Sequence, residues 1–278
     1  MTLLRSIAVT GSAGRVGSGI CTLARRQGLR VVGLDKRPDA VSIKADIREH
    51  HALAKHFEGV DCVIHCAGLH APHVGVASDD AFRAINVDGT ASVLRAIAIA
   101  SVPRIVLTSS TALLGGGSDP GQPARWIDDT TQPAPRTIYH ETKLVAEAKV
   151  RNATGPSLKA SIIRLGRCFD EGTRLNTLYR LSRGISVEDA AAAHLCAARA
   201  CDLDSEPQIA CADTPFERDD ASLLGSNARL VIKKRCPEVL KTFAAHQWEI
   251  PQRVDRIYAC SSAQRRWHWR PMDNIQAA

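Results

Sequence analysis

Short apolar runs alternate with helical stretches along the first 166 residues, and this alternation limits the possible folds more than any other feature. The apolar runs are SIAVT from residue 6, RVVGLD from 30, VDCVIHCAG from 60, PRIVLTSS from 103 and KASIIRLG from 159. Helical stretches separate them at residues 15–28, 48–59, 78–101 and 139–150. Strands that alternate with helices indicate a parallel, doubly wound α/β sheet. Continuous apolar strands are typical of a sheet that is buried on both faces.

The first apolar run leads directly into the glycine-rich stretch TGSAGRVG, with Gly11, Gly14 and Gly17 three residues apart. A tight turn after a strand needs residues without a β-carbon, and a bare backbone lets amides approach a pyrophosphate closely. The helix that follows presents the positive end of its dipole to such phosphates. The spacing differs from the commoner G-x-G-x-x-G, but a strand before it and a helix after it favour a dinucleotide site.

An acidic residue, Asp35, ends the second predicted strand, eighteen residues after Gly17. A carboxylate there can accept hydrogen bonds from the adenosine ribose and would repel a 2′-phosphate, which favours NAD over NADP. The neighbouring Lys36 and Arg37 leave NADP open, because their side chains could receive a 2′-phosphate.

The stretch IYHETK places Tyr139 and Lys143 four residues apart, on one face of a predicted helix. The segment before it, residues 115–137, is rich in Gly, Pro, Ser and Thr and predicts a long loop. Long loops in compact domains often carry function. The motif alone is weak evidence, because its spacing also arises by chance.

Composition argues against several classes of protein. The chain has 278 residues, 45% hydrophobic and 23% charged, as in ordinary globular proteins, and its net charge of +7 is not concentrated in a long basic run. We therefore expect no nucleic-acid partner. The nine cysteines form no C-x-x-C pair, so we expect reduced thiols, a cytoplasmic protein and no metal, although histidines and cysteines crowd between His50 and His73. Neither a signal segment nor a membrane-spanning run is apparent.

Taken together, these motifs resemble the extended short-chain dehydrogenase/reductase family, also called the NAD-dependent epimerase/dehydratase family. The resemblance rests on the order of TGSAGRVG, LDKRPD, ADI, HCAG, INVDGT, LTSSTALLG, YHETK, IIRLG, ISVEDAAAAH and WHWRP, which together span most of the chain. It implies a Rossmann-like domain at residues 1–166 and a small substrate lobe at 167–278, with segments returning to the main domain. Family members also commonly form homodimers.

The resemblance implies a catalytic triad of Ser110, Tyr139 and Lys143. A tyrosine with an ordinary pKa of about 10 is a poor base at neutral pH. A nearby ammonium group and an oxidised nicotinamide favour its phenolate, which can then exchange a proton with a substrate alcohol. From the residues alone, Ser110 could equally cap a helix at the end of its strand. The resemblance further implies that cofactor contacts come from Gly11, Ala13, Gly14, Arg15, Val16, Gly17, Asp35, Lys36, Asp46, Ile47, Cys66, Ala67, Gly68, Asn86, Thr108, Tyr139, Lys143 and Leu165.

The chain departs from the sugar-nucleotide members of the family after the fifth predicted strand. Leu165 replaces a proline, and a short segment separates RLGRC from ISVEDA, so we expect a small substrate rather than a sugar nucleotide. The segment is most similar to the uronate-dehydrogenase-like branch, whose carboxylate-binding arginine falls near Asn176. Arg174 is the first candidate to replace it, with Arg180 and Arg183 as alternatives, because a guanidinium binds a carboxylate through two hydrogen bonds. Ser110 and Thr111 complete the predicted substrate contacts.

Three functions agree with this pattern. The first is an NAD(P)-dependent oxidoreductase that acts on a small hydroxyl or carbonyl compound, such as an acidic sugar. The second is an epimerase or dehydratase that regenerates a bound NAD in each turnover. The third is a non-catalytic protein that senses NAD(P), since a fold does not determine a function. The joint presence of Ser110, Tyr139 and Lys143 favours an enzyme.

Overall fold

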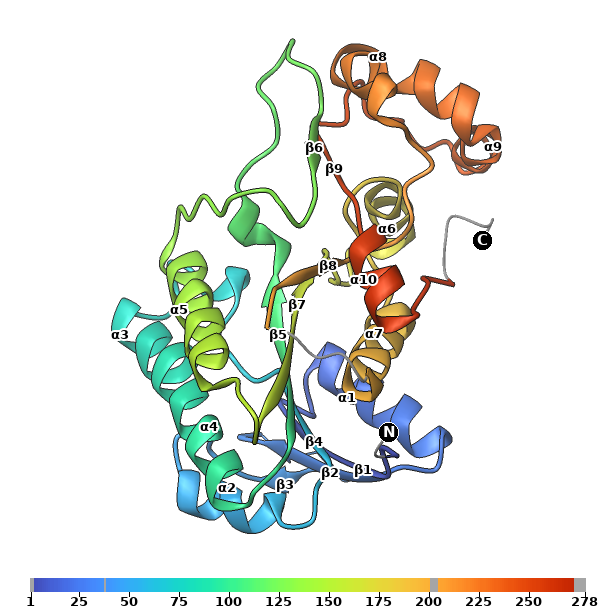
Figure 1. Ribbon diagram of the computed structural model, residues 1–278. Helices are drawn as coiled ribbons and strands as arrows, with labels where there is room; N and C mark the ends of the chain where they lie inside the picture. Colours follow the sequence, from blue (N-terminus) through green and yellow to red (C-terminus); the bar gives the residue numbers. More distant parts are fainter. Residues whose placement is uncertain (1–2, 38, 201–204, 273–278) are drawn as a thin grey trace.

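A seven-stranded parallel sheet forms the centre of the molecule, which a computed structural model describes for residues 3–37, 39–200 and 205–272. The strands run in the order β3-β2-β1-β4-β5-β7-β8, so the sequence-based prediction of a doubly wound parallel sheet is confirmed (Figure 1). Their bounds are β1 Ser6–Thr10, β2 Arg30–Asp35, β3 Ile43–Lys44, β4 Cys62–His65, β5 Arg104–Ser110, β7 Lys159–Leu165 and β8 Gln208–Ala210.

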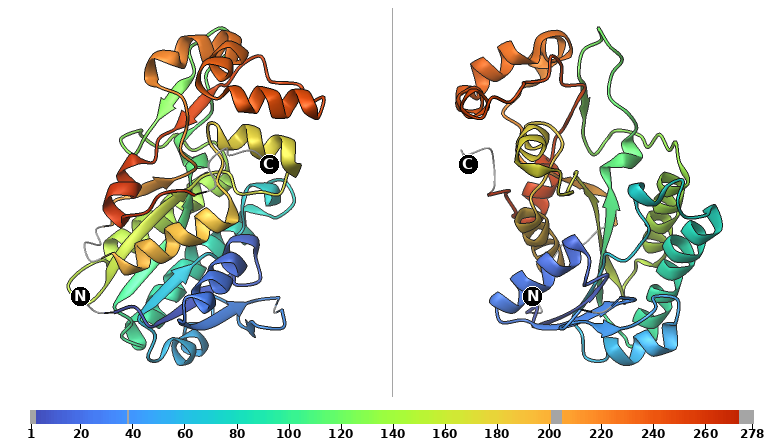
Figure 2. Two further views of the ribbon diagram at one scale, coloured as in Figure 1. Left: turned by 90° about the vertical axis from the view of Figure 1, so that its right-hand side faces the viewer. Right: turned by 180° about the vertical axis from the view of Figure 1, so that it is seen from behind.

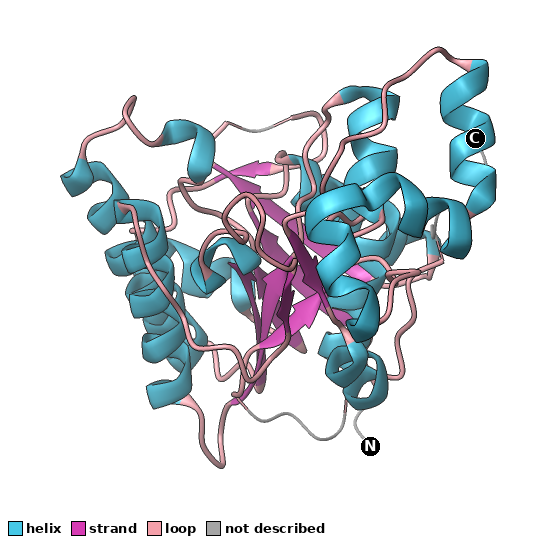
Figure 3. Ribbon diagram, turned by 90° about the horizontal axis from the view of Figure 1, so that it is seen from above, coloured by secondary structure: helices cyan, strands magenta, loops and turns pink. Residues whose placement is uncertain are grey.

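Two layers of helices enclose the sheet (Figure 3). Helices α1 (Arg15–Arg26), α7 (Val187–Arg199) and α10 (Ser261–Trp267) lie on one face, and α2 (His50–Phe57), α4 (Gly89–Ile99) and α5 (Ile138–Ala153) lie on the other (Figure 1). Successive side chains of a strand point to opposite faces. Ile7 and Val9 therefore enter the apolar core beneath α1 and α7, whereas Ala8 enters the core beneath α2 and α4. Burial on both faces explains why the strands read as unbroken apolar runs.

A small lobe with its own apolar core stands beyond the carboxyl ends of the strands (Figure 2). It contains α6 (Gly172–Arg180), α8 (Ala221–Arg235) and α9 (Pro237–Ala245), with a parallel pair of short strands, β6 (Arg125–Ile127) and β9 (Arg256–Tyr258). Strand β6 precedes residue 166 in the chain, while α7, β8 and α10 follow it and pack on the main sheet. The chain thus crosses between the two parts several times, and a division at residue 166 stays a prediction.

The predicted helix at residues 78–101 is helical throughout but not uniform. It consists of α3 (Asp79–Phe82), a π-helical segment η2 (Arg83–Asp88) and α4. A π-helical turn widens the backbone spiral and is frequent at functional sites. The buried Asn86 lies within this segment. Three single-turn 3₁₀ segments, η1 (Ala71–His73), η3 (Thr111–Leu114) and η4 (Arg218–Asp220), lie in the connections.

Two histidines are buried in the sheet domain with both ring nitrogens hydrogen-bonded. His194 Nδ1 lies 2.7 Å from the Ala190 carbonyl oxygen, which can only accept, so Nδ1 carries the proton and Nε2 accepts from the Thr108 hydroxyl at 2.8 Å. His65 Nδ1 lies 2.7 Å from Thr10 Oγ1, and its Nε2 lies 3.1 Å from Thr90 Oγ1. Burial lowers the pKa of His65 to about 3 and of His194 to about 4.

These buried neutral rings predict acid lability. The unfolded chain takes up protons on both histidines as the pH falls below about 6.5, while the folded chain does not. The contribution of these rings to the free energy of unfolding is therefore fully present above that pH. As the pH falls further, the free energy of unfolding decreases by about 1.4 kcal/mol per pH unit for each histidine, until the folded rings are protonated. Urea unfolding between pH 7 and 4 measures this slope. His194→Gln should give a shallower slope than the unsubstituted protein, and parallel curves would contradict the assignment.

Candidate active site

A cleft of about 1210 Å³ runs along the carboxyl ends of the strands and separates the sheet domain from the lobe. It crosses the point where β1 has β2 on one side and β4 on the other, which is where open α/β sheets bind their ligands. The structure brings all but two of the predicted site residues to this cleft. Those that line it are Gly11, Ala13, Gly14, Arg15, Val16, Gly17, Asp35, Lys36, Asp46, Ile47, Cys66, Ala67, Gly68, Thr108, Ser110, Thr111, Tyr139, Lys143 and Leu165.

The glycine turn is packed too tightly for side chains. Gly11 has a φ of +72°, in the left-handed region, and its amide donates to the Leu34 carbonyl oxygen at 2.8 Å. A β-carbon on Gly17 would lie 2.1 Å from the Gly11 carbonyl oxygen, which is fixed backbone. The turn therefore brings the first turn of α1 against the end of β1. Gly14 caps α1 without a side-chain hydrogen bond, so the amides at the start of the helix are available to an anion.

Asp35 joins the glycine turn to the end of β2. Its Oδ2 accepts from the Ala13 amide at 3.1 Å and its Oδ1 accepts from the Arg37 amide at 2.8 Å. Three basic side chains, those of Lys36, Arg37 and Arg48, border this end of the cleft. Arg48 forms a two-point ion pair with Asp46, with contacts of 2.6 and 3.0 Å, and mainly this hydrogen bonding lowers the pKa of Asp46 to about 2.

The three predicted catalytic residues meet at the other end of the cleft. Ser110 ends β5, and its Oγ accepts from the Ala112 amide at 3.1 Å, so it also caps η3. Tyr139 and Lys143 are buried on the first turns of α5, which begins at the cap Thr137. Burial raises the pKa of Tyr139, against a smaller opposing effect of the Ser110 hydroxyl. Burial also lowers the pKa of Lys143 to about 8.

Lys143 is held by the backbone of β5. Its Nζ donates to the Thr108 carbonyl oxygen at 2.5 Å. The Thr108 hydroxyl donates to His194 and therefore accepts from the Cys66 thiol at 3.0 Å. Burial raises the pKa of the Cys66 thiol to about 12, so this cysteine contributes a packed, protonated side chain rather than a nucleophile.

Asn86 does not line the cleft, although the resemblance had placed it among the cofactor contacts. Its Oδ1 accepts from the Leu69 amide at 2.8 Å, and its Nδ2 donates to the Leu69 carbonyl oxygen at 3.0 Å and to Thr142 Oγ1 at 3.1 Å. Both ends of the amide are occupied by protein. Asn86 thus fixes the loop after β4 against α5, outside the residues that line the cleft.

Arg174 is likewise not among the cleft residues, because it lies on the exposed face of α6 and donates to the Glu249 carbonyl oxygen at 3.1 Å. The arginines that do line the lobe side are Arg167, Arg183 and Arg256. Arg183 is one of the alternatives that the sequence offered for a carboxylate-binding arginine near Asn176. Arg256 and the aromatic cleft residues Phe169, Tyr179 and Tyr258 carry no sequence signal, since only the folding of the lobe brings them to the cleft.

Clusters of potential metal ligands and membrane-spanning helices were sought in residues 3–37, 39–200 and 205–272. Within those ranges, no group of three or more His, Cys, Asp or Glu side chains could hold a metal ion. The same ranges contain no helix that is both long and apolar enough to span a bilayer.

Sequence comparison assigns the family. A family model described as the NAD dependent epimerase/dehydratase family matches residues 7–180. The chain belongs to this family. An uncharacterised protein of Mycobacterium tuberculosis strain H37Rv is 41% identical over 110 residues, which are 37% of this chain and 12% of that protein. A 3β-hydroxysteroid dehydrogenase/Δ5→4-isomerase of the same strain is 32% identical over 167 residues, covering 55% of this chain and 44% of the relative. The match therefore spans less than half of either relative's length.

Solved structures of similar architecture carry the same fold. A mutated uronate dehydrogenase has a TM-score of 0.69 at 18% identity, over 98% of this chain and 83% of that one. A UDP-glucose-4-epimerase from Stenotrophomonas maltophila, solved with NAD and a formylated UDP-arabinopyranose, has a TM-score of 0.69 at 20% identity, over 98% and 94% of the two chains. At such low identity, these likenesses establish only the fold of this member of the epimerase/dehydratase family.

The residues present fit the dinucleotide for which the family is named. The turn leaves no room for a β-carbon at Gly11 or Gly17, and α1 offers amides that no side chain caps. Asp35 lines the cleft at the end of β2, with its carboxylate oriented by the Ala13 and Arg37 amides. NAD would be held by these residues at its adenosine and pyrophosphate portions, with Tyr139 and Lys143 at its nicotinamide end.

Substitution of Gly17 tests the cofactor cradle. Gly17→Ala should weaken NAD binding at least tenfold, because the new methyl group displaces the Gly11 carbonyl and with it the pyrophosphate turn. Isothermal titration with NAD measures the change, and circular dichroism checks that the fold persists. Gly155→Ala is a matched control, since a β-carbon there meets nothing within 4 Å. Equal affinities of the two variants would contradict the assignment.

Proposed function

We propose that this protein is an oxidoreductase that uses NAD to interconvert a small acidic hydroxyl compound and its carbonyl form. The observation that carries the proposal is the meeting of Ser110, Tyr139 and Lys143 at the lobe end of a dinucleotide cleft. NAD, when bound, supplies the acceptor or donor of hydride. NADP is the alternative cofactor, because Lys36, Arg37 and Arg48 border the adenosine end.

Tyr139 is the proposed acid-base residue. In the oxidation direction its oxygen takes the proton of the substrate hydroxyl, and in the reduction direction it returns a proton to the carbonyl oxygen. Ser110, whose hydroxyl interacts with Tyr139, would hold the same substrate oxygen. Lys143 favours the Tyr139 phenolate through its charge, and the Thr108 carbonyl holds that charge in place.

The position of Tyr139 predicts both the effect of its removal and the pH dependence. Tyr139→Phe should lower kcat by about 10²-fold or more while NAD binding persists, because only the proton transfer is lost. Since burial raises the pKa of Tyr139, oxidation should accelerate as the pH rises and reduction should slow. Absorbance of the reduced cofactor at 340 nm, with a panel of uronic acids, aldoses and simple alcohols, measures both. Full activity of Tyr139→Phe would refute the proposed role.

Two arginines in the lobe wall of the cleft, Arg183 and Arg256, favour an acidic substrate. Arg183 and Arg256 share one carboxylate, Asp255, with contacts of 3.6 and 2.8 Å. Burial pushes the pKa of Asp255 upward, but Arg256 and the nearby arginines lower it overall, so this carboxylate stays charged. Two guanidinium groups facing one carboxylate leave an excess positive charge. The Arg183 guanidinium also lies 4.4 Å from the centre of the Tyr179 ring, which restricts its orientation.

Exchange of Arg183 should separate acidic from neutral substrates. Arg183→Met should raise KM for a uronic acid at least tenfold, because a charge-assisted hydrogen bond is lost, and should change KM for the corresponding neutral aldose little. Arg174→Met is the control, since Arg174 lies outside the cleft. Equal effects of Arg183→Met on both substrates would show that the arginine binds no anion.

An epimerase or dehydratase on the same site is the second candidate, favoured by the family match. It is distinguished by turnover of a sugar without net formation of reduced cofactor.

A homodimer stays a prediction. Helices α4 and α5 lie side by side on the outer face of the molecule and expose Ile99 and Val145, which agrees with such an assembly (Figure 1).

A further inference from the structure

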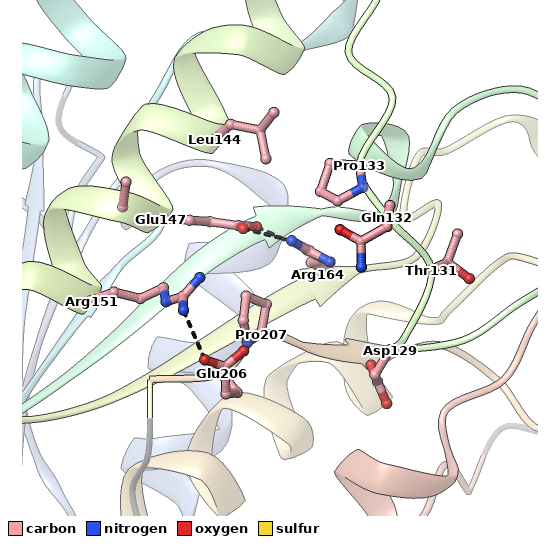
Figure 4. A pocket seen from close by; sticks show the side chains of 11 residues that line it. Asp129, Thr131, Gln132, Pro133, Leu144, Glu147, Arg151, Arg164, Glu206 and Pro207 are labelled. Atoms are coloured by element: carbon pink, nitrogen blue, oxygen red, sulfur yellow. Dashed lines mark hydrogen bonds and ion pairs between the residues drawn. The ribbon is translucent and has the colours of Figure 1, made fainter.

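An ion pair is buried between α5 and the sheet, beside the residues that line the cleft but not among them. Glu147 and Arg164 have side chains that are 5% and 7% exposed, and Arg164 Nη2 lies 2.8 Å from Glu147 Oε2. Arg164 Nε donates to Glu147 Oε1 at 3.1 Å, and the Ser109 hydroxyl donates to the same oxygen at 2.5 Å. Figure 4 shows the two side chains pointing toward each other between α5 and the sheet.

This pair connects α5 and β5, which hold the proposed catalytic residues, with the neighbouring strand β7. Glu147 follows Lys143 by four residues on α5, and Lys143 follows Tyr139 by four, so all three lie on one helix face. Ser109 precedes Ser110 on β5. Arg164 precedes Leu165 on β7, and the β5–β7 register places Ser109 opposite Arg164. A shift of the pair would therefore move the helix and both strand ends together.

The pair also sets the charge around Lys143. Burial disfavours the ammonium form, and the nearby Glu147 carboxylate opposes this effect. The other polar groups around Lys143 offer it no formal negative charge: the Thr108 carbonyl accepts its hydrogen bond, the Cys66 thiol and His65 are neutral, and His70 interacts with it as a like charge. Arg164 would add positive charge if Glu147 did not neutralise it.

Stability alone does not account for such a pair. Burying two charges costs solvation that their attraction recovers only in part, and apolar replacements of similar volume are often neutral or stabilising. A retained buried ion pair that touches catalytic elements therefore points to a role in positioning.

We propose that Glu147 and Arg164 are positioning residues for the reaction: Glu147 aligns β5 with α5 through the hydrogen bond that it accepts from Ser109. Its carboxylate, one helical turn from Lys143, also favours the charged form of that ammonium group. Arg164 holds the Glu147 carboxylate in place from β7. The chemical meaning of this device rests on the proposed hydride-transfer function, but the charge of Lys143 can be measured without a substrate.

The surroundings of the pair supply a matched control. A cavity of about 220 Å³ borders Glu147 and Arg164 (Figure 4). Arg151, one helical turn further along α5, and Glu206, just before β8, line the same cavity. Arg151 Nη2 lies 2.9 Å from Glu206 Oε1, but these side chains are 49% and 61% exposed. The two ion pairs thus share a helix and a cavity and differ in burial and in contact with β5. Because the cavity can admit water to polar substitutes, Glu147→Gln should still fold.

Kinetics compare three variants. Glu147→Gln should lower kcat at least tenfold with the affinity for NAD unchanged, because Glu147 does not line the cleft and a small misplacement of catalytic groups is costly. In this variant, the decline of kcat at high pH, where Lys143 loses its proton, should begin at a lower pH. The reason is that Lys143 loses the carboxylate that favours its charged form. Arg164→Lys keeps the charge, so kcat should fall less and the pH of the decline should stay the same. Arg151→Met should match the unsubstituted protein in both. A folded Glu147→Gln with unchanged kcat and pH profile would overturn the proposal.

A titration without substrate separates this proposal from the proposed function. Lysine labelled with ¹³C at Cε reports each ammonium group by NMR, and loss of one signal in Lys143→Met assigns that of Lys143. We expect the pKa of Lys143 to be lower in Glu147→Gln than in the unsubstituted protein and unchanged in Arg151→Met. An unchanged Lys143 pKa in Glu147→Gln refutes the positioning role. If no substrate is turned over at all, the proposed function fails, and the titration alone decides on Glu147.

Discussion

The contact of Gly17 with the Gly11 carbonyl oxygen is the constraint on which the arrangement of the cleft depends. It presses the start of α1 against the end of β1, which no side chain larger than hydrogen would allow. Helix α1 then packs along α7, where a β-carbon on Gly19 would lie 2.5 Å from Val187 Cγ1. Helix α7 carries His194, whose ring fixes the Thr108 hydroxyl. One close approach at the glycine turn is thereby linked to β5, whose Thr108 carbonyl oxygen accepts the hydrogen bond of Lys143.

A second line of contacts reaches α5, the helix that carries Tyr139 and Lys143, from the opposite face of the sheet. The Thr10 hydroxyl, just before the glycine turn, bonds His65, and His65 bonds Thr90 in α4. Thr90 donates to the Asn86 carbonyl oxygen, and the Asn86 side chain bonds Thr142 between Tyr139 and Lys143. Hydrogen-bonded groups buried at low dielectric must all be satisfied at once. The polar interior therefore specifies a single alignment of β1, β4 and α5, where apolar packing alone would tolerate small shifts.

What could be read from the sequence is what depends on neighbours along the chain. The glycine turn, Asp35 at a strand end and the Tyr139–Lys143 spacing are local patterns, and the structure brings all of them to the cleft. The resemblance placed Asn86 there too, but it does not determine which way the side chain turns within a π-helical stretch. Arg256 lies 91 residues after Leu165, the last of the predicted cofactor contacts, and its strand pairing with β6 holds it in the lobe wall. Arg174 and Arg183 are both near the expected position, and the course of α6 decides between them.

The lobe closes its own apolar core around Leu181, Phe216, Leu224 and Ile257, and it pairs β6 with β9 in a sheet separate from the main one. Its α8 and α9 lie beyond residue 180, where the family match ends. Mutations that reshape the lobe interior need not disturb the cores that enclose the parallel sheet. The part of the chain that builds the lobe wall of the cleft can therefore change in sequence while the packing beneath the glycine turn is kept. Such separation would let one dinucleotide-binding fold accept different substrates by change in one part of the chain.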